Sequence, residues 1–367
     1  MNQSSPRTEG VFLLTALGLF VVITGCNPGT RGDTMASEAS HGEAVLTEWH
    51  EVELVDELWE VGRMEGPDDQ VLGRIADVVF IGHGLALSDA HANLIHWYDT
   101  SGMHLYSSGG SGGGPGEFRR VQSLDLLPDG TLVALDGGGR SIEFFSRNGD
   151  SVDHLLFPGA VEDMCIIDST IVVLGVVEGS DLPLHLMDLA DRSVTSIGST
   201  DVPETDSPHR SAMVLGLLDG SIGCVADRIV YARSSDGSVR ALNLDGTMLW
   251  EVELPSFTAI AYMDDGERGI RTSVPEGATE FHSFHSVTRF GQTVAAQIKR
   301  IDLRTRDVSF SAVFLDLATG RVLGKDDSLP MIMAVREDRI AIVREDPVPR
   351  LAVYSIALRQ GSQEEEH

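Results

Sequence analysis

Residues 109–118 read GGSGGGPGEF, and they separate two stretches that follow one pattern of short β-rich runs. The first stretch starts at residue 75 and reads IADVVFIG, LALSDA, LIHWYDTSG and HLYSSGG; the second reads VQSLDLLPDG, TLVALDGG, SIEFFSRNG and SVDHLLF. Superposition places LALSD at 85–89 over LVALD at 132–136, an offset of 47 residues. Such runs between Gly, Asp and Asn turns predict strands, and this period is typical of four-stranded propeller blades.

Weaker copies of the unit follow, and the last contains only three strands. The copies occupy residues 161–199, 211–254, 282–325 and 331–358. The missing strand is available at residues 53–61 (ELVDELWEV), which have no partners of their own and would remove two open edges by docking on the last blade. The sequence therefore predicts an all-β, six-bladed β-propeller over residues 49–358, with four-stranded antiparallel blades and an N-terminal closing strand. Because the middle copies are degenerate, five or seven blades also remain open.

The glycine run could be a ligand loop or a structural loop. A phosphate-binding P-loop needs Lys and a hydroxyl residue where Glu117 and Phe118 stand, and no frame of the run fits a dinucleotide fingerprint. In the structural interpretation, glycines permit positive φ, Pro115 fixes a turn and Phe118 packs between neighbouring blades. The misfit favours the structural loop, whose residues are Gly112, Gly114, Pro115, Gly116, Glu117 and Phe118.

The N-terminus predicts export. Residues 11–23 form an apolar run of thirteen residues, shorter than the ~20 of a membrane-spanning helix and typical of a signal-peptide core. The following ITGC at 23–26 resembles the bacterial lipobox, which implies that Cys26 is acylated; an ordinary cleaved signal with an incidental Cys is the alternative. We expect a lipoprotein signal peptide at 1–25, a flexible tether at 26–48 and a disordered acidic tail at 359–367.

Lipid on Cys26 would anchor the protein to a membrane without spanning it. Asn27 gives no retention signal of the Asp type, which favours the outer membrane, facing the periplasm or the surface, within the bacterial cell envelope. In an oxidising periplasm, Cys165 and Cys224 could form a disulfide. Each lies in an apolar run where a free Cys is a common small hydrophobe, so the spacing leaves both states open.

The composition limits the possible partners. The chain has 27 basic and 56 acidic residues and a formal net charge of −29, which repels nucleic acid and favours cations, basic partners or simple solubility. Residues 255–280 form a long insertion that is either a partner-binding lip or a mobile loop.

Few residues suggest chemistry. Asp89 and Asp136 occupy equivalent blade positions and could converge on a divalent cation such as Ca²⁺, but capping of the following turns is favoured because a metal site needs a convergent set. His282 and His285 are predicted to point to opposite faces of a strand. No nucleophile motif such as GxSxG is present. Blade-to-blade packing is expected for the aromatic residues Trp97, Tyr98, Phe144 and Phe145.

The glycine run, the DG turn at 129–130 and Asp136 together resemble bacterial six-bladed β-propeller lipoproteins related to the NHL repeat. The matching residues of the run are Gly112 and GPGEF at 114–118. The resemblance extends over residues 49–358 and is strongest at 75–157. It implies the fold and an envelope location, but little about chemistry.

The sequence predicts a monomeric, non-catalytic propeller that binds or scaffolds a protein or a small ligand at the envelope. The alternative is a metal-dependent hydrolase or lyase of the gluconolactonase-like six-bladed type, whose Glu, Asn and Asp ligand positions have no match here. A third hypothesis is an extracytoplasmic sensor that reports a ligand to a partner.

Overall fold

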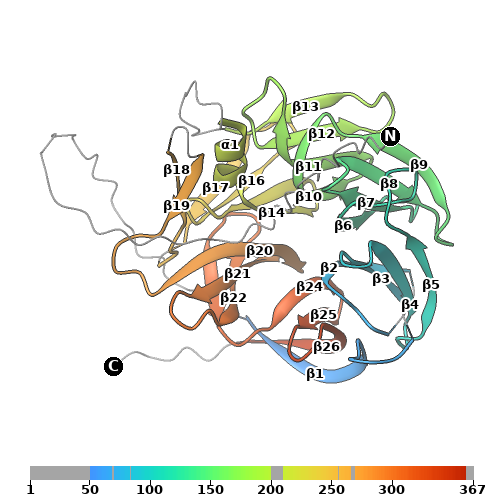
Figure 1. Cartoon of the computed structure of the whole chain (residues 1–367). Coiled ribbons are helices and arrows are strands. Elements are labelled where there is room, and N and C mark those ends of the chain that lie inside the picture. The colour runs from blue at the N-terminus through green and yellow to red at the C-terminus, as the bar shows by residue number, and fades with distance from the viewer. Residues whose placement is uncertain are drawn as a thin grey trace, which may run out of the picture. The chain divides into compact units, whose positions relative to one another are not determined.

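The computed structural model describes residues 50–67, 70–82, 84–199, 210–254, 256–265 and 269–360. In these ranges the chain forms six four-stranded antiparallel sheets arranged as the blades of a propeller (Figure 1). The predicted all-β, six-bladed fold is therefore confirmed.

The first three blades are consecutive in sequence. Blade 1 comprises β2 (Ile75–Ile81), β3 (Gly84–Asp89), β4 (Leu94–Asp99) and β5 (His104–Gly109). Blade 2 comprises β6 (Val121–Leu126), β7 (Leu132–Asp136), β8 (Ser141–Phe145) and β9 (Ser151–Leu156). Blade 3 comprises β10 (Gly159–Ile167), β11 (Thr170–Val177), β12 (Leu184–Asp188) and β13 (Val194–Ile197).

The last three blades include an insertion and the N-terminal strand. Blade 4 comprises β14 (Gly220–Val225), β15 (Arg228–Arg233), β16 (Ser238–Leu242) and β17 (Met248–Glu253). Blade 5 comprises β20 (Glu280–Phe290), β21 (Thr293–Asp302), β22 (Val308–Asp316) and β23 (Val322–Asp326). Blade 6 comprises β24 (Met331–Arg336), β25 (Arg339–Arg344), β26 (Arg350–Gln360) and β1 (His50–Val61).

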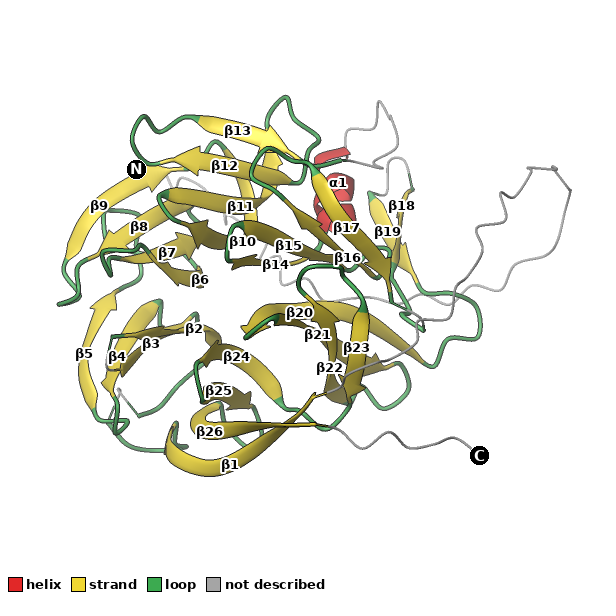
Figure 2. Ribbon diagram, turned by 180° about the vertical axis from the view of Figure 1, so that it is seen from behind, coloured by secondary structure: helices red, strands yellow, loops and turns green. Residues whose placement is uncertain are grey.

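The first strand of each blade faces the centre of the ring. Strands β2, β6, β10, β14, β20 and β24 each lie beside the equivalent strand of the next blade, and β24 lies beside β2. Figure 2 shows these strands around the axis, with the outermost strands at the rim. The ring is therefore closed within one chain.

The closure depends on β1, as the sequence predicts. This strand pairs antiparallel with β26 from His50↔Gln360 to Val61↔Leu351, with irregularities between Leu54 and Trp59. Val52 is buried among blade 5 and blade 6 residues, whereas Trp59 packs towards blade 1, 6.2 Å from the ring of Tyr98. A strand from the N-terminus thus joins the last blade to both of its neighbours.

Hydrophobic clusters fill the spaces between blades, because neither face of a blade is covered by the blade itself. Trp97 and Phe145 belong to the cluster between blades 1 and 2, Phe144 to that between blades 2 and 3, and Tyr98 to that between blades 6 and 1. The predicted packing role of these four aromatic residues is confirmed.

The structure contains one helix in its described ranges that the sequence analysis missed. Helix α1 (Arg210–Leu218) precedes blade 4 and reads RSAMVLGLL, with no acidic residue in its first turn and no basic residue in its last. Such a short apolar run without capping signals does not separate helix from strand by its periodicity. The long insertion also has structure, because β18 (Ala261–Asp264) pairs with β19 (Ile270–Ser273) and the ring of Tyr262 contacts Gly216 of α1.

Several predicted segments lie outside the described residues. They include the signal peptide, Cys26 and the tether. Strand β26 extends through Gln360, two residues into the segment expected to be a tail. No helix in the described part of the chain is long and apolar enough to cross a membrane.

Candidate functional site

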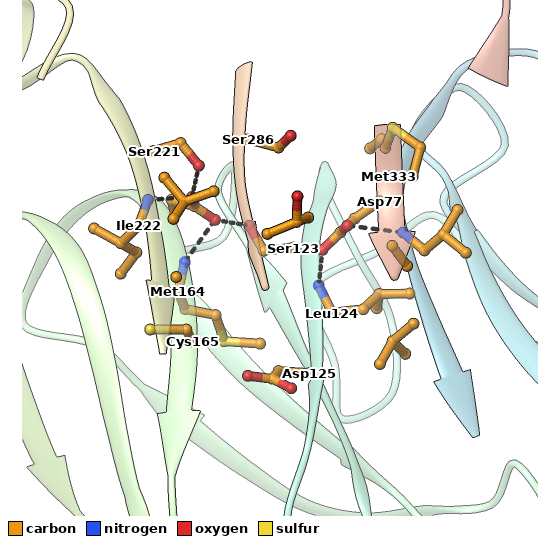
Figure 3. A pocket seen from close by; sticks show the side chains of 18 of the residues that line it. Asp77, Ser123, Leu124, Asp125, Met164, Cys165, Ser221, Ile222, Ser286 and Met333 are labelled. Carbon is orange, nitrogen blue, oxygen red and sulfur yellow. Dashed lines mark hydrogen bonds between the residues drawn. The ribbon is translucent and has the colours of Figure 1, made fainter. Parts of the chain in front are cut away.

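The innermost strands surround a cavity of about 720 Å³ on the propeller axis. Its lining residues come from β2, β6, β10, β14, β20 and β24, so every blade contributes to it. Figure 3 shows side chains from these strands converging on the space, including Asp77, Ser123, Asp125 and Ser221. We refer to this space as the axial cavity.

Irregular pairing within the innermost strands determines which side chains face neighbouring blades. The register between first and second strands shifts at Ile75/Asp77, Val121/Leu124 and Val161/Asp163 in the first three blades. Blades 5 and 6 show similar shifts at Phe284/Ser286 and Ile332/Ala334. A β-bulge redirects the side chain next to it, which explains how a polar residue in an apolar strand can reach sideways.

Three aspartates repeat one hydrogen-bond arrangement around half of the ring. In Asp77, Oδ1 accepts from its neighbour Val78 N (2.7 Å) and Oδ2 from Leu124 N (2.7 Å) of blade 2. Asp125 repeats this with Leu126 N and Ile166 N of blade 3, and Asp163 with Met164 N and Ile222 N of blade 4. Each carboxylate therefore joins its own innermost strand to the next one.

At the next two junctions, uncharged side chains outside the innermost strands connect neighbouring blades. Ser234 Oγ accepts from Phe284 N (2.9 Å), which connects blade 4 to blade 5. The buried amide of Gln297 accepts from Ile332 N and donates to Pro330 O, both at 2.7 Å, which connects blade 5 to blade 6. The carboxyl groups that line the cavity all come from blades 1 to 3 and the start of blade 4.

Burial opposes ionisation of these carboxyl groups. It raises the pKa of Asp77 well above its usual value, and the neighbouring Asp163 and Asp125 raise it further. Burial raises the pKa of Asp125 to about 6 and also raises that of Asp163, although hydrogen bonds from backbone and serine donors oppose the shift. Charge on this wall is therefore costly at neutral pH.

Further polar groups on the cavity wall have spare hydrogen-bonding capacity. Nε2 of His285 and Oγ1 of Thr288 are buried and have no hydrogen-bond partner among the described residues, and both residues line the axial cavity. Burial lowers the pKa of His285 to about 4, so its ring is neutral at pH 7. Buried polar groups left without partners are destabilising, and a bound ligand or water could satisfy them.

Charged side chains of both signs also line the cavity. Arg74 and Arg120 belong to the beginnings of blades 1 and 2, whereas Glu162 and Asp219 belong to blades 3 and 4. Burial raises the pKa of Glu162 and of Asp219. Tyr262 of the inserted hairpin lies near both, and burial together with these two carboxylates raises its pKa to about 12. Tyr262 therefore interacts with two carboxylates of the cavity wall, although it does not line the cavity itself.

Asp89 and Asp136 do not meet at the axis. The carboxylate of Asp89 accepts from the backbone N–H groups of Gly73, Arg74, His91 and Ala92. That of Asp136 accepts from Arg119, Arg120 and Gly138. Each carboxylate fixes the turn after its own strand to the segment that enters the same blade.

The glycine run forms a compact loop. Glu117 N donates to Gly114 O (3.0 Å), which closes a turn around Pro115 and Gly116, and Gly116 has a φ of 74°. The Glu117 carboxylate accepts from the N–H groups of Gly113 and Gly114. Phe118 is fully buried in the cluster between blades 1 and 2, where its ring centroid lies 5.9 Å from that of Phe145. This is the arrangement expected of a structural loop.

His282 and His285 line different cavities. This agrees with the prediction that they point to opposite faces of their strand. His285 lines the axial cavity, and its ring lies 5.4 Å from that of Phe310. His282 lines a separate, smaller cavity and accepts a hydrogen bond from Thr258 N at Nδ1. Within the described ranges, no three His, Cys, Asp or Glu side chains are arranged to hold a metal ion.

Cys165 and Cys224 form a disulfide, which resolves the alternatives left by their spacing. Cys165 belongs to β10 and Cys224 to β14, so the bond joins the innermost strands of blades 3 and 4. Both cysteines also line the axial cavity.

Sequence reasoning missed the aspartates that join the blades. A signal was present, because an Asp interrupts the innermost apolar run in three successive units: IADVVFIG, VQSLDLL and VEDMCII. His285 and Thr288 gave no such signal, since their lack of partners depends on the packing around them.

The comparisons with known proteins support the fold. No family model and no curated protein matches the chain. Among solved structures, a member of the DUF4221 family from Bacteroides vulgatus aligns with a TM-score of 0.57 and 11% identity over 85% of this chain and 99% of that one. A protein from Bacteroides fragilis, described as exported, aligns with a TM-score of 0.55 and 10% identity over 84% of this chain and 95% of that one. The chain is thus similar in fold to bacterial propellers, one of which is described as exported.

Proposed function

We propose that this protein is an envelope lipoprotein whose propeller binds a small polar ligand in the axial cavity. The observation that carries the proposal is the cavity itself, which all six blades line. Its volume of about 720 Å³ lies within the ~300–1,000 Å³ typical of small-molecule sites. Nε2 of His285 and Oγ1 of Thr288 supply hydrogen-bonding groups that the described residues leave without partners.

The hydrogen bonds of the cavity carboxylates support binding rather than proton transfer. Asp163 accepts from two backbone N–H groups and from the hydroxyls of Ser123 and Ser221. Asp77 and Asp125 each accept from two backbone N–H groups. Through these interactions the carboxylates hold neighbouring innermost strands together around the ligand. The cavity therefore has a fixed shape.

The disulfide supports the proposed location outside the cytoplasm. Bonds of this kind persist in oxidising compartments such as the periplasm and are rare in the cytosol. The apolar run at 11–23 and Cys26 agree with export followed by lipid attachment. We propose the outer membrane as the site of attachment, with the propeller facing the periplasm or the surface.

Ligand capture tests the proposal. The full-length protein is purified from envelopes, incubated with a small-molecule extract of the same cells, washed and analysed by mass spectrometry. A blocking variant, Ala76→Phe, places a ring at a half-buried position on the cavity wall. The matched control Ala318→Phe makes the same change at an exposed turn in blade 5.

We expect wild type and Ala318→Phe to retain the same small molecule and Ala76→Phe to lose it. The proposal is wrong if wild type retains nothing, or if all three proteins retain it equally. Metal analysis of the same samples addresses the alternative: a stoichiometric divalent ion together with turnover of a lactone or ester would favour a metal-dependent hydrolase or lyase.

A further inference from the structure

A second cavity, of about 180 Å³, lies against blade 5 and shares no lining residue with the axial cavity. Its walls come from β20, β21, β22 and β23 and from the segment that leaves β17 of blade 4. We call it the blade 5 pocket. A single water occupies roughly 30 Å³ of the liquid, so this pocket has room for more than one water molecule.

The walls of the blade 5 pocket combine an apolar part with polar and charged side chains. Phe257, Ile298 and Val313 line it, and the Phe257 ring stacks on that of Phe284 with 4.9 Å between centroids. Apolar cavities of about 150 Å³ are large enough to bind benzene. The blade 5 pocket therefore has the size and the lining for one aromatic ring.

One hydroxyl in this lining has no partner. Ser311 is completely buried on β22, and its Oγ has no hydrogen-bond partner among the described residues. A buried hydroxyl without a partner destabilises the folded protein compared with a hydroxyl that has one. Because Ser311 lines the pocket, a ligand that brings a hydrogen-bonding group would satisfy it.

The ionic groups at the pocket are already paired with one another. Arg300 lies 3.2 Å from Glu280 and 3.3 Å from Asp327, and Lys325 lies 2.8 Å from Asp327. His282 accepts from Thr258 N at Nδ1, and its Nε2 lies 3.1 Å from Glu280 Oε1. Burial lowers the pKa of His282, so its ring is neutral at pH 7. Because the positive and negative side chains at the pocket balance one another, the pocket favours an uncharged ligand.

We propose that the blade 5 pocket binds a small neutral aromatic molecule that carries one hydroxyl group, of the phenol class. The ring packs between Phe257, Ile298 and Val313, and the hydroxyl exchanges a hydrogen bond with Ser311. This site is independent of ligand binding in the axial cavity.

Phenol itself is the probe for this site. Its binding to the full-length protein is titrated by saturation-transfer NMR, and we expect saturable binding with a dissociation constant on the order of 1 mM, since so few atoms make contact. Ser311→Ala should weaken binding about fivefold, the effect of one hydrogen bond. Because that hydroxyl has no partner in the free protein, the same variant should keep or raise the Tm. Val322→Phe fills the pocket and should abolish binding.

Two matched changes on β22 serve as controls. Ser309→Ala and Val308→Phe alter exposed positions on the same strand and should leave phenol affinity unchanged. Ala76→Phe, which blocks the axial cavity, should also bind phenol normally, so failure of one site is distinguishable from failure of the other. The proposal would be overturned if wild type showed no saturable binding of phenol. It would also be overturned if the Ser311→Ala and Val322→Phe variants bound phenol with the same affinity as wild type.

Discussion

Single carboxylates make the connections between innermost strands in the first half of the ring. Asp125 shows the arrangement, with one oxygen on Leu126 N of its own strand and the other on Ile166 N of blade 3. The residue provides two hydrogen bonds, but its charge is buried beside the axial cavity. The balance between these two effects depends on pH.

Protonation of Asp125 gives the first prediction. Its pKa is about 6 in the folded protein, whereas an unfolded Asp titrates near pH ~3.9. The folded state therefore binds the proton more tightly, and its contribution to stability is lost as pH rises through this window. Between pH 4.5 and 7.5, Asp125→Asn should remove about 2 kcal/mol of the pH-dependent fall in unfolding free energy.

Urea unfolding at the two pH values measures this effect. Asp129→Asn is the control, because Asp129 caps an exposed turn through Thr131 and hydrogen bonds to Thr131 lower its pKa, which places its titration below the window. An Asp125→Asn protein with the wild-type pH dependence would show that this carboxylate is not the titrating group.

Conformation at single glycines gives the second prediction. Gly109 has a φ of 102°, and a Cβ there would lie 2.8 Å from the ring of Phe118. At Gly113 the nearest atom would be the flexible end of Arg119 at 3.4 Å. Gly109→Ala should lower the unfolding free energy of the protein by about 1–3 kcal/mol. Gly113→Ala should lower it by less than about 0.5 kcal/mol. Chemical denaturation compares the two; equal effects would exclude this packing of the run.

Cys26 provides a third test at this scale. If Cys26 carries lipid, cells grown with radiolabelled palmitate should incorporate the label into the wild-type protein. The labelled protein should then be found in the membrane fraction. Cys26→Ser should abolish the label and release the protein into the soluble fraction, whereas Cys165→Ser should keep the label. Membrane association that persists without label in Cys26→Ser would show another mode of attachment.

Strands and turns were the features best predicted from sequence. All six blades appear where the repeat places them, because alternating apolar runs and Gly or Asp turns determine local pairing. The helix α1 was missed, since RSAMVLGLL has no capping residues, and so was the hairpin β18–β19 inside the long insertion. The axial cavity could not be predicted, because it depends on bulges that rotate residues such as Asp77 and Asp163 out of the alternating pattern.

The disulfide joins two elements and gives the fourth prediction. Cys165 on β10 and Cys224 on β14 are separated by 59 residues. In the chain-entropy description, a cross-link that closes a loop of this size stabilises the folded protein by up to about 4 kcal/mol relative to the unfolded chain. Reduction, or the Cys165→Ala/Cys224→Ala double variant, should therefore lower the Tm by several degrees. An unchanged Tm on reduction, with both thiols open to alkylation beforehand, would argue against the bond.

At the scale of the whole molecule, the axial cavity exists only because the ring is closed. Every blade lines it, and blade 6 is completed by β1 from the other end of the chain. Loss of β1 would expose the edge of β26 and the surfaces that Val52 and Trp59 cover. An opened ring could move blade 6 away from blade 1 and lose the shape of the cavity.

Truncation tests this closed ring most directly, as the fifth prediction. Calorimetry would compare a protein without residues 49–62, which include β1, with one without residues 27–45, which precede it. Removal of 49–62 should lower the Tm of the whole propeller by at least about 10 °C, and removal of 27–45 should leave it within about 1 °C of wild type. Equal melting temperatures for the two truncated proteins would contradict closure by the N-terminal strand, and with it the closed axial site.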